Sequence, residues 1–145
     1  MNADANQVNM LVVEDNPADV VFFREALEAM QMLAALRVVG DGEEAMRFLQ
    51  RQSPFADALR PDVVVLDLNL PIMNGNEVIA RMADDAALNR IPVAILTSST
   101  SEECLCNIYP QGRCLYFTKT DDFRRLQDIV RQIAAHAKTA PKGLQ

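Results

Sequence analysis

Five polar side chains stand at the carboxyl ends of short apolar runs in the sequence, and their types suggest one kind of chemistry. They are Glu14, Asp15, Asp67, Thr97 and Lys119. Three carboxylates that share one crevice repel each other unless a cation lies between them. A hard divalent ion with oxygen ligands satisfies this need, and Mg²⁺ suits a site that supplies only a few carboxylates. We therefore expect Glu14, Asp15 and Asp67 to hold Mg²⁺.

Asp67 is also a candidate nucleophile. An aspartate can accept a phosphoryl group when a metal ion and a side-chain cation neutralise the oxygens of the transferring group. Lys119 supplies a cation, and the Thr97 hydroxyl can donate a hydrogen bond to a phosphoryl oxygen. Each of these residues alone has an ordinary structural explanation, such as a buried ion pair for Lys119. Their joint position at strand ends favours the functional interpretation.

The apolar runs predict five strands, which alternate with five helices. The expected strands are 8–13, 35–39, 62–66, 92–96 and 114–118, and the expected helices are 17–32, 43–52, 75–84, 102–108 and 121–136. This alternation is typical of an α/β fold, a doubly wound parallel sheet covered by helices on both faces. Functional crevices in such sheets lie at the carboxyl ends of the strands, where the five polar side chains stand.

Length and composition limit the alternatives. The chain has 145 residues, enough for one domain, which we expect at 8–137 between tails at 1–7 and 138–145. Its formal net charge of −6 argues against direct nucleic-acid binding. No apolar run is long enough to span a membrane, and the polar N-terminus does not resemble a signal peptide. We therefore expect a cytoplasmic protein.

The three cysteines, Cys104, Cys106 and Cys114, are an odd number and form no C-x-x-C pair. We interpret them as reduced structural thiols, with metal binding or redox use as the alternatives.

Several segments of the sequence resemble the receiver domain of bacterial two-component response regulators. They are VVEDNPAD at 12–19, DGEEA at 41–45, PDVVVLDLNLPIMNG at 61–75, IPVAILTSS at 91–99 and LYFTK at 115–119. The resemblance covers about residues 8–137, and it is closest to small single-domain regulators associated with phytochrome-type sensor kinases. It implies the strand order 2-1-3-4-5. It also implies a signalling switch that a sensor histidine kinase phosphorylates, and a bacteriophytochrome is one candidate for that kinase.

The resemblance also implies a role for individual residues. Asp67 would be the phosphoacceptor, Asp15 a direct metal ligand and Glu14 a ligand through water. Asn69 would offer its backbone carbonyl to the metal. Thr97 would sense the phosphoryl group and Lys119 would bind it. Tyr116 would be the rotating aromatic side chain of the output face, with an ordinary edge-strand aromatic as the alternative.

Two features depart from the family pattern. Thr120 follows Lys119 where the family has a proline in a cis peptide, and a cis bond before another residue costs about 2.5–4 kcal/mol. The direction of the Lys119 side chain is therefore an open question. Pro110 interrupts the region of the fourth helix, which we expect to be short or reshaped.

Other function classes fit less well. A haloacid-dehalogenase-like phosphatase needs an aspartate two residues after its nucleophile, where this chain has Asn69. A flavodoxin-like cofactor binder needs a phosphate-binding loop after its first strand, where Glu14 and Asp15 would repel phosphate. A degenerate receiver that serves only as an interaction module stays open. A phosphohistidine role for His136 is less favoured than a helix-terminal charge.

We further expect a switch rather than an enzyme with external substrates, and a homodimer formed through the last strand and last helix. The run CLYFT at 114–118 has no charge or proline to protect a sheet edge. The last helix carries an apolar stripe formed by Phe123, Leu126, Val130, Ile133 and Ala137. Ile129 makes this stripe wider than a contact with one sheet requires. The alternative is that the whole stripe packs on the sheet.

Overall fold

The computed structural model describes residues 7–98 and 104–139. Within them, five strands form a parallel sheet in the order β2-β1-β3-β4-β5, which confirms the predicted order. The strands are β1 Val8–Val13, β2 Ala34–Val39, β3 Val63–Leu66, β4 Val93–Thr97 and β5 Cys114–Thr118. Because all pairings are parallel, the carboxyl ends of the strands lie along one edge of the sheet.

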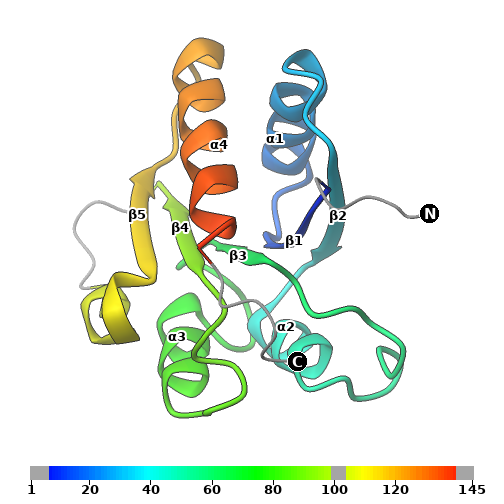
Figure 1. The fold of residues 1–145 in the computed structure, drawn as a ribbon, viewed down its shortest axis with the longest axis vertical. Helices are drawn as coiled ribbons and strands as arrows, with labels where there is room; N and C mark the ends of the chain where they lie inside the picture. The colour runs from blue at the N-terminus through cyan, green and yellow to red at the C-terminus, as the bar shows by residue number, and fades with distance from the viewer. Residues whose placement is uncertain (1–6, 99–103, 140–145) are drawn as a thin grey trace.

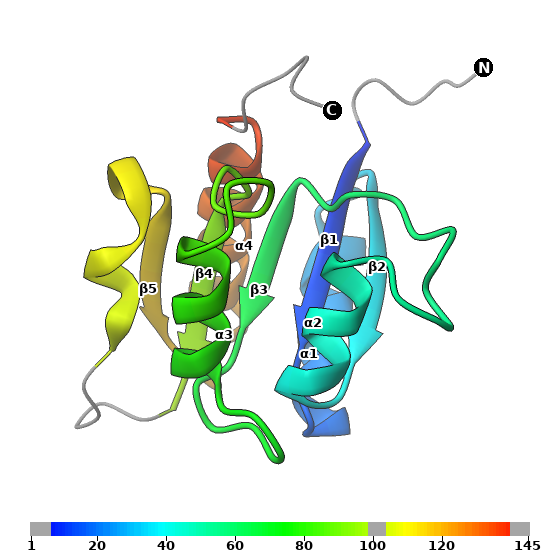
Figure 2. The ribbon, with the colours of Figure 1, turned by 90° about the horizontal axis from the view of Figure 1, so that it is seen from below.

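Four α-helices cover the sheet (Figure 1). They are α1 Pro17–Ala29, α2 Gly42–Leu49, α3 Gly75–Ala83 and α4 Phe123–Ala137. Figure 2 shows α2 and α3 on one face and α1 and α4 on the other. Asn or Asp side chains accept hydrogen bonds from first-turn amides of every one of these helices, which satisfies donors that have no partner inside the helix.

Alternating strand residues build two cores, one on each face of the sheet. Leu11 and Val13 of β1 pack with buried residues of α2 and α3. Met10 and Val12 of the same strand pack with buried residues of α1 and α4. Because successive side chains of a strand point to opposite faces, a continuous apolar run is needed for a strand buried on both sides.

The predicted helix 102–108, the fourth in chain order, is absent as an α-helix from the described residues. Two short 3₁₀ turns precede β5 instead, η1 Leu105–Ile108 and η2 Pro110–Gly112, while residues 102 and 103 of the predicted helix lie outside the described ranges. Pro110 lacks the N–H that a continuing α-helix would use, so the prediction of five helices is wrong here and that of a reshaped segment is confirmed.

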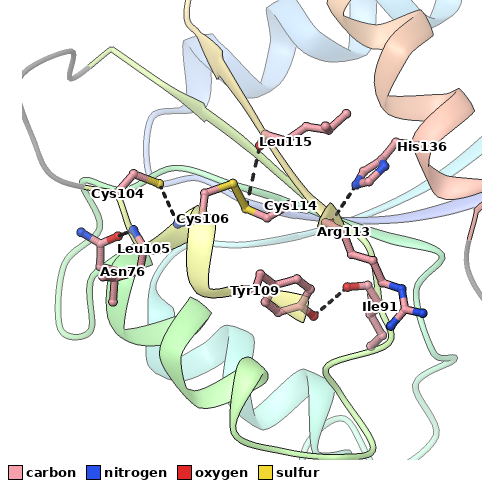
Figure 3. The surroundings of a disulfide bond; sticks show 10 residues. All are labelled: Asn76, Ile91, Cys104, Leu105, Cys106, Tyr109, Arg113, Cys114, Leu115 and His136. Carbon is pink, nitrogen blue, oxygen red and sulfur yellow. Dashed lines mark hydrogen bonds between the residues drawn. A yellow bond between two sulfur atoms is a disulfide. The ribbon is translucent and has the colours of Figure 1, made fainter. Parts of the chain in front are cut away.

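The prediction of three reduced thiols is also wrong. Cys106 and Cys114 form a disulfide with a Cα–Cα distance of 5.3 Å, while Cys104 is free (Figure 3). The two bonded residues are eight positions apart in the sequence, and the turns between them bring η1 beside the first residue of β5.

The apolar stripe of α4 packs within the chain. Leu126, Ile129, Val130 and Ile133 are all at most 3% exposed. The stripe is wider than one sheet contact, as expected, but Ile129 is not available to a partner, because α4 packs against both α1 and the sheet. None of the described helices is long and apolar enough to cross a membrane.

Candidate functional site

The carboxyl ends of β1, β3, β4 and β5 border an open cleft. Half of the residues that line it are acidic, and the lining consists of Glu14, Asp15, Asn16, Asp19, Asp67, Asn69, Ser98, Lys119, Thr120 and Asp121. The strand ends deliver these residues because parallel register aligns them: Val13 lies opposite Leu66, and Thr97 lies opposite Thr118. Residues more than 100 positions apart in the sequence thus share one cleft.

Three carboxylates of the cleft form a compact group. Glu14, Asp15 and Asp67 each offer an oxygen, and these oxygens all lie within 4.8 Å of one another. Glu14 is 8% exposed and Asp67 is 5% exposed, whereas Asp15 faces solvent. Burial, together with the nearby Asp67, raises the pKa of the Glu14 carboxyl, although Lys119 and the Asn16 amide oppose this rise.

Lys119 lies among these carboxylates. Its Nζ is 2.9 Å from Asp67 Oδ2, 2.8 Å from Glu14 Oε1 and 2.6 Å from Asp19 Oδ2. Burial alone would lower the pKa of this ammonium, but the three carboxylates together raise it. Among the described residues, the cis peptide bond is Ser53–Pro54, so the bond between Lys119 and Thr120 is trans. The Lys119 side chain nevertheless contacts Asp67. It therefore points to Asp67 although Thr120 replaces the proline of the family pattern.

Asp19 is the site residue that the sequence interpretation missed. It lies on α1, 100 residues from its partner Lys119. The available signal was its position in the first turn of the helix that begins directly after Glu14 and Asp15, with Asn16 as the N-cap.

The charges of the cleft do not balance without a further cation. Glu14, Asp15, Asp19 and Asp67 bring four carboxylates around the single ammonium of Lys119. These carboxyl groups outnumber the ammonium by three, and a divalent cation with hard oxygen ligands would offset two of the uncompensated charges. The donor set of the structure is therefore suitable for a metal such as Mg²⁺.

The backbone around Asp67 is held from two sides. The Asp67 amide donates to Val13 O at 3.2 Å, and the Asn69 amide donates to Asp67 Oδ1 at 3.1 Å. A Cβ on Gly75 would collide with the carbonyl oxygen of Asp67 and would lie 2.8 Å from Leu68 Cα. Glycine at position 75 thus lets the start of α3 approach the backbone that carries Asp67.

The remaining predicted residues, Thr97, Tyr116 and His136, are not among the residues that line the cleft. Thr97 is fully buried at the end of β4, and its neighbour Ser98 lines the cleft. Tyr116 stands on β5, the edge strand, with 39% of its surface exposed. His136 is buried and its Nε2 lies 2.8 Å from Arg113 O, so this nitrogen carries the proton and donates to the carbonyl.

Comparisons with known proteins agree with this geometry. Residues 10–131 match the family model described as the response regulator receiver domain. The response regulator Rcp1 of Synechocystis sp. (strain ATCC 27184 / PCC 6803 / Kazusa) is 36% identical over 86% of this chain and 82% of its own length.

Two solved structures are similar as well. The phosphorylated cyanobacterial phytochrome response regulator RcpA has a TM-score of 0.79 and 36% identity, and the match covers 94% of this chain and 97% of RcpA. The Mn²⁺-bound form of Rcp1 has a TM-score of 0.74 and 35% identity, with 84% of this chain and 91% of that chain covered. With its strand order, its acidic cleft and a family match over most of its length, the chain belongs to the response regulator receiver domain family.

Proposed function

We propose that this chain is a phosphorylation switch that accepts a phosphoryl group on Asp67 from a phosphohistidine of a sensor histidine kinase. One observation carries the proposal: Lys119 Nζ lies 2.9 Å from Asp67 Oδ2 in a cleft where Glu14 and Asp15 offer further carboxylates. A nucleophilic carboxylate, an adjacent fixed cation and a set of metal ligands are the parts that phosphoryl transfer to an aspartate requires.

In the proposed step, an oxygen of Asp67 forms a bond to phosphorus while the bond between phosphorus and the kinase imidazole breaks. The imidazole leaves and takes up a proton. Lys119 stabilises the negative charge that collects on the phosphoryl oxygens, because its ammonium already lies within hydrogen-bond distance of Asp67. The Asn69 amide, which donates to Asp67 Oδ1, holds the carboxylate in a fixed orientation.

Glu14, Asp15 and Asp67, with the backbone carbonyl of Asn69, are the proposed ligands of Mg²⁺. When bound, the ion neutralises oxygens of the carboxylates and of the incoming phosphoryl group. The compact group of three carboxylate oxygens supports this assignment, as does the similarity to the Mn²⁺-bound form of Rcp1. Ligands that are all oxygen atoms favour Mg²⁺ and Mn²⁺ over softer ions.

The proposed output is a change of surface rather than turnover of an external substrate. Thr97 would respond to the phosphoryl group, and Tyr116 would transmit the change on the exposed side of β5. We expect signalling through protein contacts in the cytoplasm without direct nucleic-acid binding, in keeping with the formal net charge of −6.

A kinase of the phytochrome type is the proposed phosphoryl donor, because RcpA is a phytochrome response regulator. The homodimer also stays a proposal. Because the apolar face of α4 is buried within the chain, the edge of β5 is the part of the predicted interface that remains available. Leu115 of this strand is only partly buried. The donor class can be tested by comparing phosphoryl transfer from a phytochrome-type kinase with transfer from an unrelated histidine kinase.

The central experiment is incubation of the full chain with acetyl phosphate and Mg²⁺, followed by intact mass measurement. We expect the mass of one phosphoryl group to be added, with no addition in Asp67→Asn and a wild-type addition in the exposed control Asp57→Asn. EDTA should suppress the reaction, because uncompensated carboxylates repel the incoming dianion. Labelling that persists in Asp67→Asn would refute the assignment, and no labelling of the wild type would favour a degenerate receiver.

A further inference from the structure

Hydrogen bonds join residues 104–112, which precede β5, to α3 and to the turn before β4. The Leu105 amide donates to Asn76 Oδ1 of α3 at 2.9 Å. The Tyr109 hydroxyl lies 2.7 Å from Ile91 O (Figure 3) and 3.0 Å from Leu88 O, and both carbonyls precede β4. Burial raises the pKa of this phenol, so it remains a donor. Hydrogen bonds thus hold η1 and the turn after it on the α3 side of the sheet.

A covalent bond joins the same segment to the edge strand. The disulfide links Cys106 in η1 to Cys114, the first residue of β5 (Figure 3). Both cysteines are only partly buried, so a small thiol reagent can approach them. The third sulfur, that of Cys104, accepts a hydrogen bond from the Cys106 amide at 3.3 Å. Three sulfur atoms are therefore gathered where the connection after β4 meets the sheet edge.

We propose that Cys106 and Cys114 are a reversible redox modification site, and that the oxidised bond restrains the response of η1 and β5 to phosphorylation of Asp67. The part of the proposal that concerns phosphorylation rests on the proposed function. Tyr116 stands two residues after Cys114 on the same strand. The bond joins β5, which carries Tyr116, to η1, so the two cannot move independently.

The position of the bond favours a switch over a permanent support. Both cross-linked cysteines pack against the core on the α2 and α3 side of the sheet, but they are only partly buried and do not belong to its fully buried set. The two cysteines are only eight positions apart in the sequence, and a disulfide that closes a short loop adds the least stability. Among the described residues, β5 pairs only with β4, so the strand can shift along its unpaired side once the bond is released.

The proposed reaction is thiol–disulfide exchange with an external dithiol. One thiolate of the dithiol attacks a sulfur of the disulfide, which forms a mixed disulfide and releases the other cysteine. The second thiol then displaces the remaining cysteine, so two electrons and two protons pass to the protein and the dithiol leaves as its own disulfide. A low-mass disulfide such as glutathione disulfide reverses the reaction.

Cys104 is not the attacking group in this scheme. Burial raises the pKa of its thiol, so the protonated form dominates and is a weak nucleophile. Cys104→Ser is therefore the matched control: it removes a sulfur from the same cluster but leaves the Cys106–Cys114 bond in place.

The first experiment counts thiols in the full chain by alkylation and mass measurement across glutathione buffers of graded redox ratio. We expect one reactive thiol after oxidation, three after reduction, and a reversible transition between them. Three reactive thiols at every ratio, or a bond that persists in millimolar reduced glutathione, would overturn the proposal. The first outcome means no site exists, and the second means the bond is a permanent support.

The second experiment compares the oxidised and reduced proteins with fluoroberyllate and Mg²⁺, which imitate the phosphoryl group. We expect the amide shift of Tyr116 to be several-fold larger in the reduced protein, while acetyl phosphate labels Asp67 about equally in both. Cys106→Ser should behave as the reduced protein with or without reductant, and Cys104→Ser should follow the wild type. Equal Tyr116 shifts in both redox states would overturn the proposed restraint.

A third measurement separates this proposal from the proposed function. Hydrogen exchange of the peptide 104–118, without any phosphoryl mimic, should be several-fold slower in the oxidised protein. Unchanged exchange would contradict the redox proposal even if Asp67 is labelled. Slower exchange with no Asp67 labelling in either redox state would support the redox restraint of the segment and refute the phosphorylation switch.

Discussion

Replacement of Lys119 by methionine tests the charge arrangement of the cleft most directly. The change removes an ammonium that lies 2.8 Å from Glu14 Oε1 and 2.9 Å from Asp67 Oδ2. Both carboxylates are more than nine-tenths buried, so water can replace their lost partner only in part. Methionine retains most of the apolar stem of lysine, and the effect on stability therefore reports mainly the loss of charge.

The structure limits the size of the effect. Removal of one partner from a buried ion pair costs about 3–5 kcal/mol. The Lys119 side chain is 18% exposed in an open cleft, which favours the lower end of that range. Asp19 is 37% exposed, so its contact adds at most about 1 kcal/mol. We expect a loss of about 3 kcal/mol, equivalent to a decrease in Tm of about 10 °C for a domain of this length.

The loss of unfolding free energy in the Lys119→Met variant should depend on pH. Burial already raises the pKa of Glu14, and loss of the Lys119 hydrogen bond would raise it further. A carboxyl whose pKa is higher in the folded state than in the unfolded state favours folding at low pH, and this contribution is lost as pH rises through the folded-state value. The variant should therefore be closer to wild type at about pH 5 than at about pH 8.

Urea unfolding in EDTA, followed by circular dichroism, measures the difference. Lys138→Met is the matched control, because Lys138 is exposed at the end of α4 and should change stability by less than about 0.5 kcal/mol. Added Mg²⁺ should reduce the deficit of the Lys119 variant, since it neutralises the same carboxylates. A deficit below about 1 kcal/mol that does not change with pH would refute the placement of Lys119 among buried carboxylates.

Three further outcomes are expected. Gly75→Ala should cost about 1–3 kcal/mol in urea unfolding and slow acetyl phosphate labelling of Asp67, because the new methyl group meets backbone that cannot move aside. Gly40→Ala, which meets no atom within 4 Å, should do neither. Tyr109→Phe should lower stability by about 1–2 kcal/mol, since it leaves a carbonyl before β4 without its buried donor. Light scattering should show a dimer that Leu115→Glu dissociates without loss of labelling, and a monomeric wild type would contradict the predicted edge contact.

The sequence was sufficient to predict the sheet and the main members of the site. Runs such as Val63–Leu66 are apolar throughout, which strands buried on both faces require. Once five such runs alternate with helices, parallel pairing brings their carboxyl ends together. Glu14, Asp67 and Lys119 could therefore be placed in one cleft without knowledge of any distance. The N-terminal cap of α1 at Asn16 was equally readable, because capping depends on local residues.

Features that depend on contacts between distant elements could not be predicted in this way. The role of Asp19 depends on how α1 sits against the end of β5, which is 100 residues away. The burial of Ile129 depends on α4 packing against both α1 and the sheet, and helical periodicity alone does not show how wide a contact face the tertiary fold provides.

The region before β5 shows the same division within a few residues. Pro110 in the sequence was enough to predict that a regular helix would not continue there, because proline lacks the backbone donor. Whether Cys106 meets Cys114 was decided only by the path of η1 and η2, since a disulfide needs two Cα atoms within about 7 Å and correctly directed side chains. Residue types and local periodicity thus determined the strands, caps and strand-end chemistry, while the packing of whole elements determined which side chains became partners.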